Sequence, residues 1–280
     1  MAGSPGYGEW AAGPLLGQGS LGRVHLAHDG AGRAAALRVV HASLARDPSF
    51  RARFAREVLA IGAVRGRRVA SLVDADPHGA APWLAVEYVR GPTLAARVRD
   101  AGGPLDTTGL RALASALAGA LDDIHRAGLA HGGLRPSNVL LAPDGPRTVD
   151  FGLASGAELS APGYTAPETL AQGVAKPPAD IFSLGAVLAF AASGRGPFDA
   201  GGQDPDLTDV PGELIPLVTA CLARHPTARP APRTVARMAG LPLPGSRRRA
   251  LTLAGTLFLA QLAAAASPLG GRWAVRAGER

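Results

Sequence analysis

The first third of the chain alternates short apolar runs with polar and glycine-rich turns, a pattern typical of β-strands. Residues 48–64 differ, because their apolar side chains recur every three or four positions with charged residues between them. That spacing predicts an amphipathic helix. The strand-like runs are residues 15–16, 24–27, 34–40, 69–74 and 83–89. This part of the chain is therefore expected to form a small sheet with one helix.

After Gly91 the pattern changes to one of helices. Residues 110–127 have a continuous apolar face and end at Gly128, a residue type that commonly terminates helices. Two further apolar stretches, residues 179–193 and 213–223, are typical of buried helices. The second part of the chain is therefore expected to be mainly helical.

A proline-rich segment at residues 241–245 ends the helical part, and three arginines follow at 247–249. Residues 250–267 then contain no charge. At a rise of 1.5 Å per residue they span about 27 Å as a helix, close to the hydrocarbon thickness of about 30 Å. We therefore expect a basic linker (241–249), a single transmembrane helix (250–267) and a short tail (268–280). The alternative is an alanine-rich helix packed on the preceding domain.

The arginine cluster before this helix predicts that the preceding domain is cytoplasmic and anchored at the cell membrane. The composition adds little to this picture. Hydrophobic residues make up 47% and charged residues 18% of 280 residues, which excludes wholesale disorder. Cys221 is the only cysteine, so no intrachain disulfide is expected. The net charge of +7 comes from scattered arginines with 5% aromatic residues, and nucleic-acid binding is therefore not expected.

Two separated motifs carry candidate chemistry. Gly17, Gly19, Gly22 and Val24 form the pattern G-x-G-x-x-G-x-V, in which glycines let a backbone hairpin lie directly on phosphate groups. Further along, residues 131–138 read His-Gly-Gly-Leu-Arg-Pro-Ser-Asn, and twelve positions after that asparagine comes Asp-Phe-Gly. In order along one chain, these motifs are far more specific than any one alone.

With these motifs, residues 10–238 resemble bacterial serine/threonine protein kinases of the eukaryotic-like type. The resemblance implies an α+β fold with two lobes. A small antiparallel sheet with one helix is expected over residues 10–89 and a mainly helical lobe over residues 90–240, after a flexible segment at residues 1–9. It also implies ATP as a ligand, with Mg²⁺ held by Asn138 and Asp150.

The resemblance further implies how the nucleotide is held. Arg38 stands where the family has a phosphate-contacting lysine, and Glu57 stands where it has the partner of that lysine. The hinge between the lobes is expected to bind adenine through its main chain, and apolar side chains are expected to enclose the ring. These residues are Glu87 and Val89 in the hinge, and Val24, Ala36 and Leu140 around the ring.

Several catalytic positions depart from the family's pattern. Gly133 replaces the aspartate that takes the proton from the substrate hydroxyl, and glycine has no side chain to accept it. Arg135 replaces the lysine that neutralises the transferring phosphoryl group, and Ala161 replaces a threonine that braces base and lysine. Gly132 replaces the arginine that binds a phosphorylated activation loop.

The scaffold residues of the family are retained. Glu168 is expected to pair with Arg229, and Asp180 is expected to anchor the catalytic loop. An apolar column is expected to link the two lobes. Its members are His131, Phe151, Ile61 and Leu72.

Retained scaffold and lost catalytic groups together favour a membrane-tethered pseudokinase. It would have ATP and Mg²⁺ as candidate ligands and would act in signalling or scaffolding through an unidentified protein partner. One alternative is a serine/threonine kinase of low activity that transfers the γ-phosphate of ATP to protein hydroxyls. A second is an interaction module that needs no nucleotide.

Overall fold

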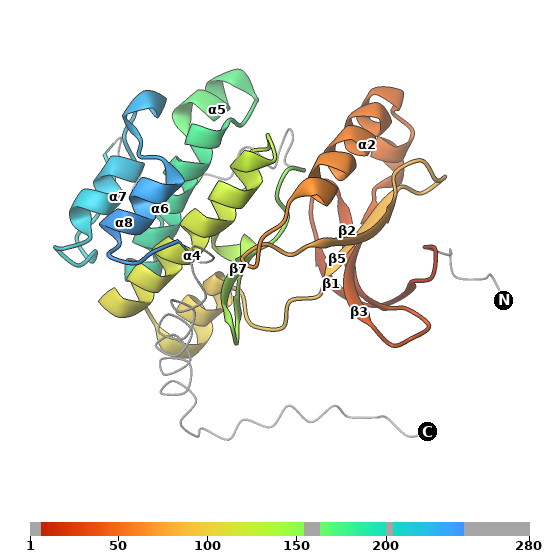
Figure 1. Cartoon of the computed structure of the whole chain (residues 1–280), viewed down its shortest axis with the longest axis horizontal. Coiled ribbons are helices and arrows are strands. Elements are labelled where there is room, and N and C mark those ends of the chain that lie inside the picture. The colour runs from red at the N-terminus through yellow and green to blue at the C-terminus, as the bar shows by residue number, and fades with distance from the viewer. Residues whose placement is uncertain (1–6, 154–162, 200–203, 244–280) are drawn as a thin grey trace.

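The computed structural model describes residues 7–153, 163–199 and 204–243. Two lobes are visible in Figure 1, a sheet with helix α2 on one side and a bundle of helices on the other. The sheet has five antiparallel strands in the order β1-β2-β3-β5-β4. Their bounds are β1 (Ala11–Gln18), β2 (Gly22–His28), β3 (Ala34–Val40), β4 (Leu72–Asp76) and β5 (Trp83–Glu87). The predicted two-lobed α+β fold is confirmed.

Helix α2 (Pro48–Ala63) follows a short helix α1 (Ala42–Ala45) and matches the predicted amphipathic helix. Asp47 caps its first turn by accepting a hydrogen bond from the backbone N–H of Ser49. The apolar residues that predicted the helix are buried against the sheet and the second lobe. They are Phe50, Phe54, Val58 and Ile61.

Two strands begin three or more residues away from their predicted starts. β1 begins at Ala11, because Ala11 and Ala12 pair with β2 although this segment shows no apolar alternation. β4 begins at Leu72 instead of residue 69. Val69 instead makes an isolated parallel bridge to Thr148 of the second lobe, so this segment joins the lobes.

The second lobe is built around two long helices, α4 (Thr107–Arg126) and α6 (Pro177–Ser193), which pack on each other. α6 is apolar on nearly all sides and lies buried between neighbouring helices, as the uninterrupted apolar sequence predicts. The remaining elements are α3 (Leu94–Ala96), η1 (Arg97–Gly102), η2 (Pro136–Asn138), β6 (Val139–Ala142), β7 (Gly145–Thr148), α5 (Pro167–Gln172), α7 (Ile215–Cys221), η4 (Pro226–Ala228) and α8 (Pro232–Met238).

One cluster of buried apolar side chains runs through both lobes, and includes Ile61 of α2, Leu117 of α4 and Leu184 of α6. A second cluster, around Trp10 and Trp83, covers the other face of the sheet. Because the main core is shared, the two lobes are held together by apolar burial as well as by the chain connection.

Among the described residues, no helix has the length and apolar character that crossing a bilayer requires. The predicted anchor at 250–267 and the tail at 268–280 lie outside the described residues. Ala161, one of the altered catalytic positions, also lies outside them.

Candidate functional site between the lobes

A pocket of about 570 Å³ opens between the lobes, a volume typical of sites for small molecules. Both lobes line it, the sheet from one side and the β6–β7 hairpin with the preceding loop from the other. The structure brings most of the predicted nucleotide residues together here. Those that line the pocket are Gly17, Gly19, Val24, Ala36, Arg38, Glu87, Val89 and Leu140, with the predicted metal ligands Asn138 and Asp150 at one end.

The pocket has an apolar half next to the hinge. Val89, Ala70 and Ala142 form a small buried cluster there, and Leu140 and Val149 pack against it. Val149 lines the pocket but was missed by the sequence analysis, since a lone valine before the Asp-Phe-Gly motif reads as ordinary core. Apolar walls on both sides of a narrow pocket suit a flat heteroaromatic ring.

The side chain of Glu87 makes an ion pair that the sequence did not indicate. Its Oε1 lies 2.5 Å from Nη1 of Arg147 on β7, and Nη2 of Arg147 lies 2.8 Å from the carboxylate of Asp144. The hydrogen bond with Asp144 raises the pKa of Arg147. These contacts fasten the hinge to the second lobe, and Asp144 is not among the residues that line the pocket.

The glycine-rich hairpin joins β1 to β2 and is stabilised by hydrogen bonds within the hairpin and with His41. The backbone N–H of Gly19 donates to the carbonyl of Gly22 at 3.0 Å, and a ring nitrogen of His41 lies 2.9 Å from the carbonyl of Gly19. His41 was missed, because only the fold brings the end of β3 beneath the hairpin.

Gly22 is not among the residues that line the pocket, so its nucleotide contact stays a prediction. A Cβ atom at this position would overlap the carbonyl oxygen of Val39 on β3. Gly22 is therefore required for the close approach of β2 and β3. Gly17, in contrast, lines the pocket and has open space around its Cβ position.

Arg38 on β3 is buried and points to the Asp-Phe-Gly motif. Its Nη2 lies 2.5 Å from Oδ1 of Asp150. The predicted pairing of Arg38 with Glu57 is wrong, since Glu57 pairs with Arg53 on its own helix at 3.5 Å and does not line the pocket. Burial raises the pKa of Glu57. The planar fork of arginine matches the geometry of a carboxylate, which suits Arg38 to this pair with Asp150.

The backbone of Asp150 is unusual. With φ of 60° it is the only non-glycine residue in the described part of the chain with a positive φ. Such a conformation costs roughly 1–3 kcal/mol and is maintained only by its surroundings. Gly152 donates to the carbonyl of His131 at 3.1 Å, and the buried Phe151 ring packs edge-on against the His131 ring. These contacts aim the Asp150 carboxylate into the pocket.

Asp180 anchors the catalytic loop, as predicted. Its buried carboxylate accepts hydrogen bonds from the backbone N–H groups of His131 (2.8 Å) and Gly132 (2.9 Å). Oδ2 also lies 2.7 Å from Nε2 of His125, a residue that the sequence analysis missed. The loop conformation therefore depends on one acidic side chain from α6.

The His131 ring completes this network. Burial lowers the pKa of His131, against the opposing effect of Asp180, so the ring is neutral. Its Nε2 lies 2.5 Å from Oγ1 of Thr148, and its Nδ1 accepts from the backbone N–H of Gly133 at 3.3 Å. The Thr148 hydroxyl in turn donates to the carbonyl of Asn138 at 3.3 Å. The loop is thus preorganised although its base is absent.

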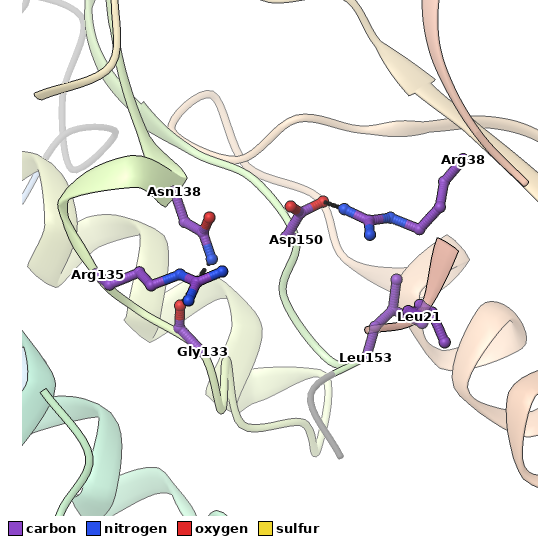
Figure 2. A pocket seen from close by; sticks show the side chains of 7 residues that line it. All are labelled: Leu21, Arg38, Gly133, Arg135, Asn138, Asp150 and Leu153. Atoms are coloured by element: carbon purple, nitrogen blue, oxygen red, sulfur yellow. Dashed lines mark hydrogen bonds and ion pairs between the residues drawn. The ribbon is translucent and has the colours of Figure 1, made fainter. Parts of the chain in front are cut away.

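Beyond the large pocket lies a cavity of about 20 Å³, shown in Figure 2. Nδ2 of Asn138 donates to the carbonyl of Gly133 at 2.8 Å on one side of it. A volume of this size holds about one water molecule. The residues that line it are Leu21, Arg38, Gly133, Arg135, Asn138, Asp150 and Leu153.

Asp150 is the only carboxylate among these lining residues, and it is paired with Arg38. Leu21, at the tip of the glycine-rich hairpin, is buried in the shared core with Leu153. Within the described residues, no acidic side chain therefore takes the place of the missing base at Gly133.

The donor types at Asn138 and Asp150 fit Mg²⁺, which commonly takes one or two protein oxygens and completes its shell with phosphates and water. The described residues contain no group of three or more His, Cys, Asp or Glu side chains that would hold a metal on their own. The Arg38 guanidinium, however, already pairs with one oxygen of the Asp150 carboxylate, Oδ1. The oxygen atoms of Asn138 and Asp150 are therefore suitable ligands for a metal, but the positive charge of Arg38 beside Asp150 opposes its binding.

The predicted pair of Glu168 and Arg229 is confirmed. Two nitrogens of Arg229 approach the two carboxylate oxygens of Glu168 at 2.5 and 2.9 Å. The Arg229 side chain is fully buried and lies over the ring of Phe182, with its Cζ 5.1 Å from the ring centre. This pair fixes α5 to the end of the second lobe.

A two-lobed body with this hairpin, this loop and this Asp-Phe-Gly motif at the lobe boundary defines a protein kinase domain. The family model described as protein kinase domain matches residues 10–239, and the chain belongs to this family.

Its relatives include bacterial serine/threonine kinases. Serine/threonine-protein kinase AfsK of Streptomyces griseus is 43% identical over 239 residues, which cover 77% of this chain and 30% of the relative. Probable serine/threonine-protein kinase PkwA of Thermomonospora curvata is 41% identical over 249 residues, or 81% of this chain and 33% of the relative. The chain thus spans about a third of the length of these relatives.

Among solved structures, the PknI kinase domain of Mycobacterium tuberculosis resembles this fold with a TM-score of 0.73 and 27% identity. The match covers 86% of this chain and 98% of that domain.

Proposed function

We propose that this chain is a membrane-tethered pseudokinase. It binds ATP between its lobes, transfers phosphate weakly or not at all, and acts by binding another protein. The observation that carries the proposal is the cavity at Gly133, which has room for about one water and whose single carboxylate is already paired.

The expected loss of catalysis follows from how much a general base contributes to the rate. A positioned general base contributes roughly 10²–10⁴-fold to a rate. Phosphoryl transfer also depends on positioning, and a glycine offers nothing to orient the acceptor hydroxyl. The two remaining side chains of the cavity, Leu21 and Leu153, are apolar and offer no proton acceptor either.

Nucleotide binding is supported by the larger pocket. Its volume of about 570 Å³, its apolar half at the hinge and its two arginines at the other end suit a nucleotide with phosphates. The protein kinase family generally uses ATP with Mg²⁺, so ATP is the first ligand to test.

Incubating the purified chain with labelled ATP, Mg²⁺ or Mn²⁺ and a generic protein substrate tests the absence of catalysis. We expect incorporation no higher than in the Asp150→Ala variant, because neither protein has a base. An assay that shows robust turnover by the native chain and none by the variant would reject the pseudokinase. Thermal unfolding of both proteins controls for folding.

A serine/threonine kinase of low activity is the second candidate. Asn138 and Asp150 are retained, and both described relatives are named serine/threonine kinases, one of them as probable. This alternative predicts slow turnover that depends on Asp150 and rises roughly 10²–10⁴-fold when Gly133→Asp restores the base. The pseudokinase predicts instead that turnover by the native chain does not exceed that of the Asp150→Ala variant.

Membrane tethering rests on the sequence of residues 250–267 alone. We expect the full chain to sediment with membranes and a chain lacking 250–267 to remain in the supernatant after carbonate washing. Equal sedimentation of the two proteins would contradict the anchor.

The remaining alternative is an interaction module that needs no nucleotide. It predicts that neither the full chain nor the chain lacking 250–267 binds ATP.

A further inference from the structure

The charges at the phosphate end of the pocket do not match those of an ordinary kinase site. Arg38, Arg135 and Asp150 line both the large pocket and the small cavity, and together they carry a net charge of one positive unit. The other acid of the large pocket, Glu87, is paired with Arg147 at the hinge. An aspartate at position 133 would bring the net charge to zero, so the Gly133 substitution leaves this end positive without any metal.

The positive charge of Arg38 already lies beside Asp150, the residue expected to bind a divalent cation. It lies 2.5 Å from Asp150, and its side chain is only 7% exposed. Arginine stays protonated at every physiological pH, so the repulsion between it and a divalent ion at Asp150 cannot be relieved by loss of a proton. A metal that binds Asp150 must therefore displace or crowd a buried positive charge.

Arg135 lacks the acceptors that it needs. Its Nε is buried and has no hydrogen-bond partner within the described residues. In Figure 2 Arg135 points towards Asn138 and Gly133, while Arg38 approaches Asp150 from the opposite side. A buried donor without an acceptor is unfavourable, and a phosphate oxygen entering between the two arginines would supply one.

We infer that this pocket binds ATP without a divalent cation, with Arg38 and Arg135 neutralising the phosphates that magnesium neutralises in the family. The inference rests on the proposed nucleotide binding and deepens it. Each guanidinium has five donors in a planar fork that matches phosphate oxygens, which lets arginine serve here where a metal would bridge. Affinity then depends on phosphate number and decreases from ATP to ADP to AMP.

Isothermal titration of the full chain in mild detergent with ATP tests this, once in EDTA and once in Mg²⁺. We expect the two dissociation constants to agree within about threefold. Binding seen only with Mg²⁺ would overturn the inference and leave nucleotide binding standing. The absence of binding in both conditions would overturn the proposed nucleotide binding itself, and the inference with it.

Two variants are expected to change ATP affinity in opposite directions. Asp150→Asn removes a negative charge and frees Arg38, so ATP affinity in EDTA should rise or stay equal. In a metal-dependent site the same change would weaken the binding that is measured in Mg²⁺. Arg38→Met keeps the buried stem, and it should weaken binding in EDTA about tenfold or more, with recovery in Mg²⁺ as Asp150 becomes free. Gly133→Asp should likewise make binding depend on Mg²⁺.

The salt-bridged surface residue Arg195 provides the matched control, because it is exposed and far from the pocket lining. Arg195→Met should leave both dissociation constants unchanged. If it changes them as much as Arg38→Met does, the effect is one of overall charge and the inference fails. Thermal unfolding without ligand shows that each variant is folded.

Discussion

Replacing Asp180 with alanine is expected to lower the free energy of unfolding by about 3 kcal/mol or more, because a buried backbone donor without an acceptor costs roughly 1–3 kcal/mol. Two such donors, the N–H groups of His131 and Gly132, end on this carboxylate, and His125 loses its partner as well. A loss of this size is a large fraction of the stability of an ordinary domain.

Urea denaturation followed by circular dichroism measures this change. Asp209→Ala is the matched control, since Asp209 is half-exposed and its ion pair within the described residues is with the exposed Arg195. Exposed ion pairs contribute about 0–1 kcal/mol, so the control should unfold almost as the native chain does. Equal losses in the two variants would show that Asp180 does not anchor the loop.

The second large effect is expected from Glu168→Ala. This change removes the carboxylate from Arg229, whose side chain is fully buried. Removing one partner of a buried pair costs roughly 3–5 kcal/mol, because the other charge is left uncompensated. Arg229 also donates to the carbonyls of Pro178, Ala223 and Arg224, which places the expected loss at the lower end of that range.

The pH dependence of this pair has a definite sign. Burial, the largest single effect, would raise the pKa of Glu168. The hydrogen bonds from Arg229 and from the backbone N–H of Glu168, together with the positive charge of Arg229, hold the pKa below its ordinary value. A carboxyl whose pKa is depressed by folding stabilises the protein above its unfolded pKa. That contribution is lost as the pH falls from the ordinary glutamate value of about 4.3 through the lower folded value.

Urea denaturation of the native chain and of Glu168→Ala at a series of pH values checks this. The difference between the two should be largest near neutral pH and should shrink in acid. Glu213→Ala is the control, because Glu213 is exposed and pairs with Arg111 on the surface. A difference that grows in acid would show that Glu168 is not stabilised as a carboxylate.

Much of this fold was predictable because its elements carry strong local patterns. Helix α2 shows apolar residues at helical spacing, and β3 has the bounds that its sequence predicts. The order of the motifs then identified the kinase resemblance and most of the pocket lining. Prediction was poorest where the pattern is weak, as in β1, whose first residues have small side chains without alternation.

The choice of charged partners was not predictable in the same way. Glu57 was expected beside Arg38 but pairs with Arg53, and Glu87 was expected to act through its main chain but also binds Arg147, 60 residues away. A charged side chain has several acceptable partners within reach of a folded surface. The geometry of the packed lobes selects among them, and no periodicity in the sequence records that geometry.

By itself, the sequence determined the family, the two lobes and the absence of a base at Gly133, because motifs and apolar spacing are local properties of the chain. Only the tertiary structure decided that Arg38 pairs with Asp150, that Gly22 serves strand packing, and that the cavity at Gly133 holds no second carboxylate from the described residues. These depend on distances between segments far apart in the chain, which packing of the shared core sets.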